Sequence, residues 1–415
     1  MSELIDLNER HYRKPAGPTV VICLDGCDPE YLRRGIPDGI FPVIGSFRQD
    51  GYFATADAAM PTFTNPNNVS IVTGAPPAVH GIAGNYYLDR STGREVMITD
   101  ASLLRSETIL ALMSRAGVKT AAITAKDKLR KILGQHLEGI CFSSEHADQC
   151  TAKEHGITEV EALVGRPKPD QYSADLSLFV LDAGIKLLER GAAELFYLSL
   201  SDYVQHKSAP GEAEADAFHR AVDERVGRLV GLGAVVGLVA DHGMNDKALP
   251  NGEPHVVFLE DELNGRFGAG TVRVICPITD PFVRHHGALG SFVRVYRRNE
   301  VELARLMDAS AALPGVAEVL DGPTAAQRFE LPLDREGDFV VLGDANTVVG
   351  STRAEHDLSG LAGHRLRSHG GLAEQPVPFM LSRPLTPEYR RIAESRRLRN
   401  FDIFEFALNG TIRRD

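Results

Sequence analysis

Four short segments rich in apolar and β-branched residues constrain the fold more than any other feature of this chain. They are TVVICL at 19–24, TAAIT at 120–124, LFYLSL at 195–200 and VVGLVA at 235–240. Such runs are typical of buried parallel strands. Helical patterns at 107–116, 176–190 and 213–229 lie between them. This alternation predicts an α/β fold with a mostly parallel central sheet and helices on both faces.

Residues 261–360 show a different pattern. Strand-like runs at 272–276, 290–296, 316–320 and 338–342 surround one helical segment at 300–313. The resulting β-β-α-β-β order predicts a smaller α+β cap inserted into the main core. A chain of 415 residues is long enough for both parts. We therefore expect a core formed by residues 1–260 and 361–415, interrupted by a cap at 261–360.

The composition excludes several classes of protein. The formal net charge of -11 argues against a nucleic-acid partner, because phosphate backbones are bound by clustered Lys and Arg. The five cysteines are odd in number and scattered, which favours reduced thiols over a disulfide framework. Residues 1–18 lack an apolar leader, and no later segment approaches the ~20 apolar residues that a membrane span needs. We expect a cytoplasmic protein without a membrane partner.

Metal-ligand residue types follow several of the predicted strands. Asp25 follows the first strand, Asp202 and His206 follow the strand at 195–200, Asp241 and His242 follow the strand at 235–240, and His369 lies in a late glycine-rich loop. The carboxyl ends of parallel strands meet at one edge of a sheet, so these side chains can converge. Asp202 and His206 are four residues apart, which places both on one face of a helical turn.

Each of these residues also has an ordinary structural explanation when taken alone. Asp-Gly after a strand is a common turn, for example. Together, three Asp and three His supply the mixed nitrogen and oxygen ligands that zinc accepts. The remaining histidines stay outside the predicted set: His80 is interpreted as orienting its loop, and His364 is the nearest omission. For His255, His285 and His286, surface and substrate-proximal roles are both open.

The segment MPTFTNPNNVS at 60–70 is a candidate nucleophile loop. Thr64 stands at the predicted start of a helix, where a threonine is most often an N-cap. A helix N-terminus also attracts a phosphoryl group through its free N–H groups and its dipole. A threonine hydroxyl placed there and coordinated by zinc would be activated as an alkoxide nucleophile.

These motifs and their order resemble the alkaline phosphatase superfamily, in particular its nucleotide pyrophosphatase/phosphodiesterase-like branch. The resemblance implies that Thr64 is the catalytic nucleophile and that the cofactors are two Zn²⁺ ions per chain. By the same resemblance, one zinc is held by Asp202, His206 and His369, and the other by Asp25, Asp241, His242 and the Thr64 oxygen.

Within that branch, HGIAGNYYLD at 80–89 and TAKDK at 124–128 resemble the phosphonoacetate hydrolase family. This resemblance implies zinc-dependent cleavage of the P–C bond of phosphonoacetate to acetate and phosphate through a phosphothreonine. It also implies that Lys126 and Lys128 bind the substrate carboxylate and that Asn85 contacts a phosphonate oxygen. From the residues alone, two lysines after a strand can aim cations into the site, and a solvated pair is an equal alternative.

Three other functions fit part of the pattern. A phosphodiesterase or nucleotide pyrophosphatase would cleave P–O bonds with the same two-zinc site. A cofactor-independent mutase of the superfamily would typically use Ser and manganese-type sites, and Thr64 speaks against it. A non-catalytic zinc-binding protein would lack a ligand or the nucleophile, and none is missing. The expected partner is a small-molecule phosphonate, and the resemblance is compatible with a homodimer.

Overall fold

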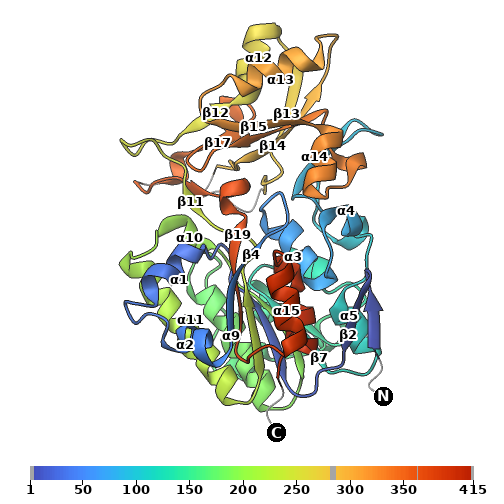
Figure 1. The fold of residues 1–415 in the computed structure, drawn as a ribbon, viewed down its shortest axis with the longest axis vertical. Coiled ribbons are helices and arrows are strands. Elements are labelled where there is room, and N and C mark those ends of the chain that lie inside the picture. Colours follow the sequence, from blue (N-terminus) through green and yellow to red (C-terminus); the bar gives the residue numbers. More distant parts are fainter. Residues whose placement is uncertain (1–3, 281–286, 362, 413–415) are drawn as a thin grey trace.

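A seven-stranded sheet forms the lower part of the molecule in the computed structural model, which describes residues 4–280, 287–361 and 363–412 (Figure 1). Its order is β4 (Tyr52–Asp57), β19 (Pro376–Leu381), β10 (Val235–Val239), β3 (Thr19–Cys23), β9 (Leu195–Ser199), β7 (Thr120–Thr124) and β8 (Ile140–Ser143). Neighbouring strands from β10 to β8 pair in parallel. β19 pairs antiparallel with β10 on one side and with the edge strand β4 on the other. The prediction of a mostly parallel sheet is confirmed.

Helices cover both faces of this sheet. On one face, α9 (Asp175–Glu189) and α11 (Ala213–Gly231) pack against each other and against β9 and β10. On the other face, α16 (Ile403–Asn409) packs on β3 and β10, next to α3 (Thr64–Thr73), while α5 (Ile109–Arg115) packs on β7. Every residue of β3, β7, β9 and β10 is buried as a result. This double coverage explains the uninterrupted apolar runs in the sequence.

A second, antiparallel sheet forms the upper part of the molecule in Figure 1. Its order is β13 (Val272–Ile275), β14 (Phe292–Arg297), β16 (Phe339–Gly343) and β15 (Val316–Asp321). It is accompanied by α12 (Leu259–Phe267), α13 (Leu303–Ala311) and α14 (Gly322–Phe329). The smaller α+β part therefore has the expected strands, with α12 and α14 in addition. The division of the chain at 261 and 360 remains a prediction.

The core of the upper sheet extends down to the loop before α3. Met60 and Phe63 belong to the hydrophobic cluster that contains Phe292, Val293 and Phe339 of the upper sheet. Thr64 follows directly in sequence, so the candidate nucleophile lies where the two parts of the molecule meet.

The five cysteines are free thiols, and four of them are buried. The structure thus contains no disulfide framework, as their odd number and scattered positions predicted. Within the described ranges, no helix combines the length and the apolar character needed to cross a membrane.

Candidate active site

Three neighbouring strands bring the predicted ligands together. Asp25 follows β3, Asp202 follows β9, and Asp241 and His242 follow β10. The sheet order β10-β3-β9 makes these strands direct neighbours, and they run parallel. The side chains at their carboxyl ends therefore lie close together, although more than 200 residues separate Asp25 from Asp241 along the chain.

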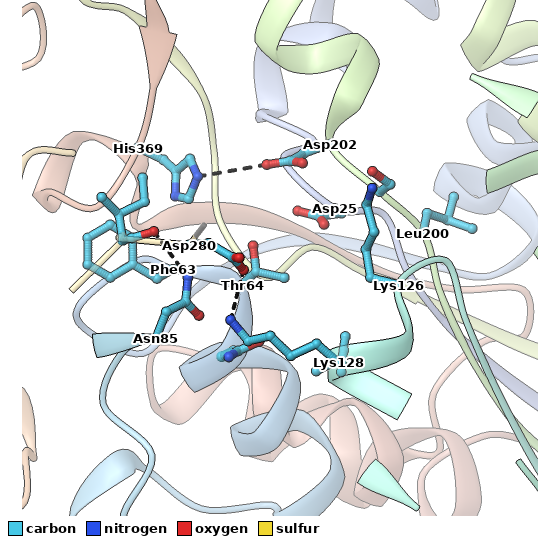
Figure 2. A pocket seen from close by; sticks show the side chains of 14 residues that line it. Asp25, Phe63, Thr64, Asn85, Lys126, Lys128, Leu200, Asp202, Asp280 and His369 are labelled. Carbon is cyan, nitrogen blue, oxygen red and sulfur yellow. Dashed lines mark hydrogen bonds and ion pairs between the residues drawn. The ribbon is translucent and has the colours of Figure 1, made fainter. Parts of the chain in front are cut away.

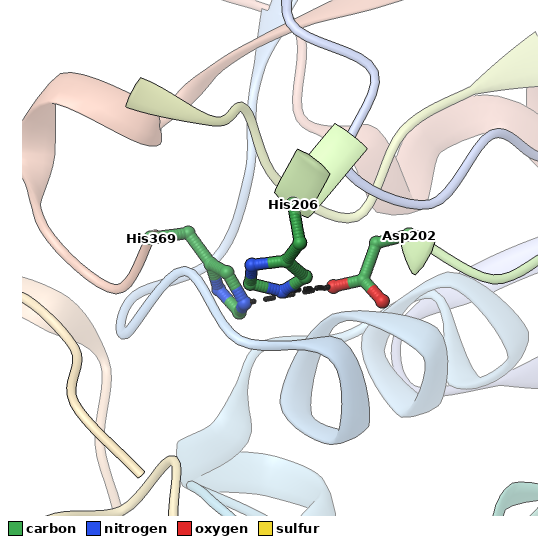
Figure 3. Close-up of side chains that lie close together, drawn as sticks. All are labelled: Asp202, His206 and His369. Atoms are coloured by element: carbon green, nitrogen blue, oxygen red, sulfur yellow. Dashed lines mark ion pairs between the residues drawn. The ribbon is translucent and has the colours of Figure 1, made fainter. Parts of the chain in front are cut away.

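Asp202, His206 and His369 form the first group of ligand atoms (Figure 3). Asp202 precedes the short helix α10 (Tyr203–Lys207), which carries His206 four residues later. The Nε2 atom of His206 lies 2.9 Å from Asp202 Oδ2, and the Nε2 atom of His369 lies 3.8 Å from the same oxygen. The ligand atoms of all three residues lie within 4.8 Å of one another, close enough to hold a single ion.

Asp25, Asp202 and His242 form the second group, again with ligand atoms within 4.8 Å. The Nε2 atom of His242 lies 3.3 Å from Asp25 Oδ1 and 3.7 Å from Asp241 Oδ2. Asp202 is thus within reach of both groups, whereas the family resemblance places it on one ion. The imidazoles of His242 and His369 stack with centroids 3.6 Å apart, so the two groups are adjacent.

Backbone carbonyls orient all three imidazoles. The Nδ1 atom of His206 lies 2.8 Å from Arg367 O, that of His242 lies 2.9 Å from Gly243 O, and that of His369 lies 2.8 Å from Thr62 O. A carbonyl oxygen can only accept, so each Nδ1 carries a proton and donates it. In the neutral ring, the Nε2 lone pair then faces the carboxylates, as in histidines that ligate metals.

This convergence of electron pairs fits a bound cation. Asp25 Oδ1 is buried and has no hydrogen-bond partner among the described residues. Burial, together with the charges of Asp202 and Asp241, raises the pKa of Asp25 well above its ordinary value. Burial and the neighbouring His242 and His206 lower the pKa of His369, which keeps that imidazole neutral. A cation would offset the repulsion between the carboxylates and would accept the lone pairs of the imidazoles.

Thr64 is the first residue of α3 and lies beside the second group. Its Oγ1 atom is 3.2 Å from His242 Nε2. Phe63 occupies the N-cap position and provides no side-chain hydrogen bond to the helix. The N-cap explanation for Thr64 is therefore wrong, because the helix begins at Thr64 itself, one residue earlier than a Thr64 cap requires. The position instead suits a group that reacts with a phosphoryl ligand at the helix N-terminus.

A glycine keeps the Thr64 and His369 loops in close contact. Gly370 has a φ of +119°, and a Cβ atom there would lie 2.5 Å from Phe63 Cε1. Both the backbone conformation and the space exclude a side chain. The aromatic ring of Phe63 can then lie edge-on to the His369 imidazole, at a centroid distance of 5.6 Å.

A pocket opens at this edge of the sheet (Figure 2). Its lining includes Asp25, Thr64, Asn85, Lys126, Lys128, Asp202 and His369, so seven of the predicted site residues share one cavity. Lys126 donates to Gln171 O at 3.2 Å and lies 5.5 Å from the Tyr172 ring centroid.

The Asn85 side chain is partly committed to the neighbouring loop. Asn85 donates its Nδ2 group to Ile278 O at 3.2 Å. Its Oδ1 atom is buried and has no hydrogen-bond partner within the ranges that the structure describes. Asn85 therefore retains polar capacity for a ligand.

Two residues at the site, Asn68 and Asp280, were not predicted from sequence. Asn68 donates its Nδ2 group to Thr64 O and to Asp241 Oδ2, and it lies within the nucleophile loop, where its position could have been noticed. Asp280 pairs with Lys128 from a distant segment that follows β13. No local pattern signals Asp280, because only the tertiary fold brings it to the pocket.

The other histidines lie elsewhere. His80 is fully buried between Ser70 Oγ and the Ile82 amide, and burial together with Arg335 lowers its pKa to about 3. His255 contacts Thr347 Oγ1 at 2.9 Å, and His364 is exposed. The predictions for His285 and His286 fall outside the described residues.

Comparisons with known proteins identify the family of this chain. Residues 19–360 match the model of the type I phosphodiesterase / nucleotide pyrophosphatase family. Crystal structures of the phosphonoacetate hydrolase from Sinorhizobium meliloti 1021, in complex with phosphonoformate and with phosphonoacetate, superpose with a TM-score of 0.92. They share 45% sequence identity with this chain over 98% of its length and 99% of theirs.

Two further relatives match over shorter stretches. A phosphonoacetate hydrolase from Penicillium oxalicum is 69% identical over 29 residues, which are 7% of this chain and 40% of that protein. The human ectonucleotide pyrophosphatase/phosphodiesterase family member 1 is 41% identical over 80 residues, which are 18% of this chain and only 8% of that protein. The chain belongs to the type I phosphodiesterase/nucleotide pyrophosphatase family and, within it, to the phosphonoacetate hydrolases.

Proposed function

We propose that this protein hydrolyses the P–C bond of phosphonoacetate, giving acetate and phosphate, with Thr64 as the nucleophile. The observation that carries the proposal is the shared pocket. One cavity is lined by Thr64, by the ligand residues Asp25, Asp202 and His369, and by two lysines. The ligand residues and Thr64 suit the phosphonate end of phosphonoacetate, and the lysines suit its carboxylate end.

Six residues would hold the metal. We assign Asp202, His206 and His369 to one Zn²⁺, and Asp25, Asp241 and His242 to a second Zn²⁺ beside Thr64. When bound, the ions supply positive charge for the phosphonate oxygens and lower the pKa of the attacking hydroxyl or water. The converging Nε2 lone pairs and the buried Asp25 oxygen support this assignment.

Thr64 would attack phosphorus opposite the methylene carbon. Thr64 gives up its hydroxyl proton to solvent, a bond forms between Oγ1 and phosphorus, and the P–C bond breaks with its electron pair moving to the carbon. The carbanion delocalises into the carboxylate as an enolate, and a proton added to carbon completes acetate. Water next attacks phosphorus of the phosphothreonine, the bond to Thr64 breaks, one proton of the water returns to Thr64 Oγ1, and phosphate leaves.

Lys126 and Lys128 would stabilise the departing group. The enolate carries more charge on its oxygens than the starting carboxylate does. Ammonium groups beside it therefore stabilise the transition state more than the bound substrate, which is the condition for lowering the barrier. Both lysines line the pocket, at the start of and within α6 (Asp127–Leu133). Asn85 would donate the second hydrogen of its Nδ2 group, which also bonds Ile278 O, to a phosphonate oxygen.

Substrate preference tests this proposal. We would measure phosphate release from phosphonoacetate and hydrolysis of bis-p-nitrophenyl phosphate by the zinc-loaded wild type and by the Lys126→Ala/Lys128→Ala variant. We expect the wild type to prefer phosphonoacetate, and the variant to lose that preference while it retains diester hydrolysis. A wild type that prefers the diester, with no effect of the lysines, would instead indicate a phosphodiesterase.

A further inference from the structure

Lys128 and Asp280 form an ion pair inside the pocket that contains Thr64. Lys128 Nζ lies 2.8 Å from Asp280 Oδ2, and the two side chains are only 14% and 13% exposed. The two side chains point toward one another (Figure 2). Lys128 belongs to α6, next to the lower sheet, whereas Asp280 follows β13 of the upper sheet. The pair therefore joins the two parts of the molecule across the pocket.

The lining of the pocket contains more acidic than basic side chains. Asp25, Asp202 and Asp280 face two lysines there. Asp25 and Asp202 belong to the ligand groups, so a bound cation would neutralise their charge. Among the described residues, Asp280 is the lining carboxylate that belongs to neither group. An anionic substrate therefore meets the charge of Asp280 even when the ligand groups hold metal.

The pair limits what can bind to Lys128. Removing Asp280 from Lys128 leaves a largely buried ammonium without its counter-charge, which is unfavourable. A ligand that brings its own carboxylate restores the pair, so that one carboxylate exchanges for another. A ligand without a carboxylate offers no such exchange, and Lys128 then remains bound to Asp280.

We propose that Asp280 is an internal stand-in for the carboxylate of the substrate. In the substrate-free protein Asp280 is paired with Lys128, and the carboxylate of the bound phosphonate displaces Asp280 from that lysine. Asp280 thus sets the affinity for the carboxylate half of the substrate without taking part in bond breaking. This inference rests on the proposed function, because it takes Lys128 as the carboxylate site.

Calorimetry with a variant that cannot turn over tests the exchange. The metal-loaded Thr64→Ala protein would be titrated with phosphonoacetate and with methylphosphonate, which lacks the carboxylate. The same titrations would follow on Thr64→Ala/Asp280→Asn, in which asparagine retains the size of the side chain and removes its charge. We expect the Kd for phosphonoacetate to fall about tenfold, while the Kd for methylphosphonate changes much less.

Two controls accompany these titrations. Adding Lys128→Met to both proteins should abolish the gain in phosphonoacetate affinity from Asp280→Asn, because no ammonium remains to be released from Asp280. Asp308→Asn removes one charge from the exposed face of α13 and should leave both Kd values unchanged.

Three results would overturn the inference in different ways. Weaker phosphonoacetate binding by Asp280→Asn would mean that Asp280 holds Lys128 in place in the complex. An equal fall in the Kd values for both ligands would reveal only a long-range effect of charge. Each of these leaves the proposed function intact. Failure of every protein to bind phosphonoacetate more tightly than methylphosphonate would contradict the carboxylate site itself, and the proposed function with it.

Discussion

The side-chain amide of Asn68 donates a hydrogen bond to Asp241 Oδ2 at 3.1 Å. The same Nδ2 group also donates to the Thr64 carbonyl at 3.0 Å. Tyr197 and Ser199 both donate to Asn68 Oδ1, at 2.7 and 2.8 Å, which fixes the orientation of the amide. One fully buried side chain thus connects the start of the nucleophile helix to a candidate metal ligand.

Replacing Asn68 should therefore disturb the Thr64 and Asp241 positions together. We expect Asn68→Ala to lower kcat/KM for phosphonoacetate by about 10–100-fold, the range typical of residues that orient metal ligands. Steady-state kinetics and a zinc titration would measure both effects. Tyr197→Phe removes one of the two donors to Oδ1 and should have a smaller effect. Wild-type kinetics and zinc affinity in Asn68→Ala would contradict this role.

Metal removal should abolish activity and reduce stability. Without cations, carboxylates and lone pairs converge in a buried site, which is unfavourable. We expect a chelator to eliminate phosphate release and to lower the Tm, and zinc to restore both. Elemental analysis should find two zinc ions per wild-type chain and fewer in His206→Ala. Full activity in thoroughly metal-free protein would contradict the assignment.

A buried ion pair supports the loops that carry two of the histidines. Lys247 Nζ lies 2.8 Å from Glu374 Oε1, and neither side chain is exposed. Glu374 also accepts from the Gly371 amide and, through its backbone carbonyl, from the Gly243 amide. These glycines follow His369 and His242 closely in sequence. The pair therefore connects both histidine loops.

Breaking this pair should be costly. We expect Lys247→Met to reduce the free energy of unfolding by about 3–5 kcal/mol, because Glu374 would remain buried without its counter-charge. Urea denaturation would measure the change. Arg33→Ala breaks the exposed pair between Arg33 and Glu30 and should have no measurable effect. Comparable stabilities of the two variants would show that burial of the Lys247 pair does not matter.

The charge of Asp402 should make stability depend on pH in the acid range. Burial acts to raise the pKa of Asp402, but Arg396 and Arg10 outweigh it and hold the pKa below its ordinary value. The unfolded chain therefore takes up the proton first, near pH 3.9, while the folded protein does not. Stability from this group is present above that pH and is lost as the pH falls through the folded pKa.

Comparison with Asp402→Asn isolates this contribution. We expect the wild type to lose more stability than the variant as the pH falls below about 4, because asparagine does not titrate. Thermal unfolding measured across that range would check the difference. Parallel stability curves for the two proteins would contradict the assignment.

Much of the lower sheet was predictable from sequence, because strands such as β3 and β10 are buried on both faces and read as apolar runs. Residues directly after those strands, such as Asp25 and His242, were predictable for the same reason. Asp280 was not, because its contact with Lys128 joins segments 152 residues apart that share no sheet. The role of Asn68 was also hidden, since its hydrogen bonds to Tyr197 and Asp241 depend on neighbouring strands that only the fold brings together.

Product identification by nuclear magnetic resonance tests the central claim most directly. Phosphonoacetate labelled with ¹³C would be incubated with the zinc-loaded wild type and with Thr64→Ala. P–C bond cleavage predicts acetate and phosphate in equal amounts from the wild type, and neither above background from the variant. Intact phosphonoacetate after incubation with a wild type that hydrolyses bis-p-nitrophenyl phosphate would contradict the account.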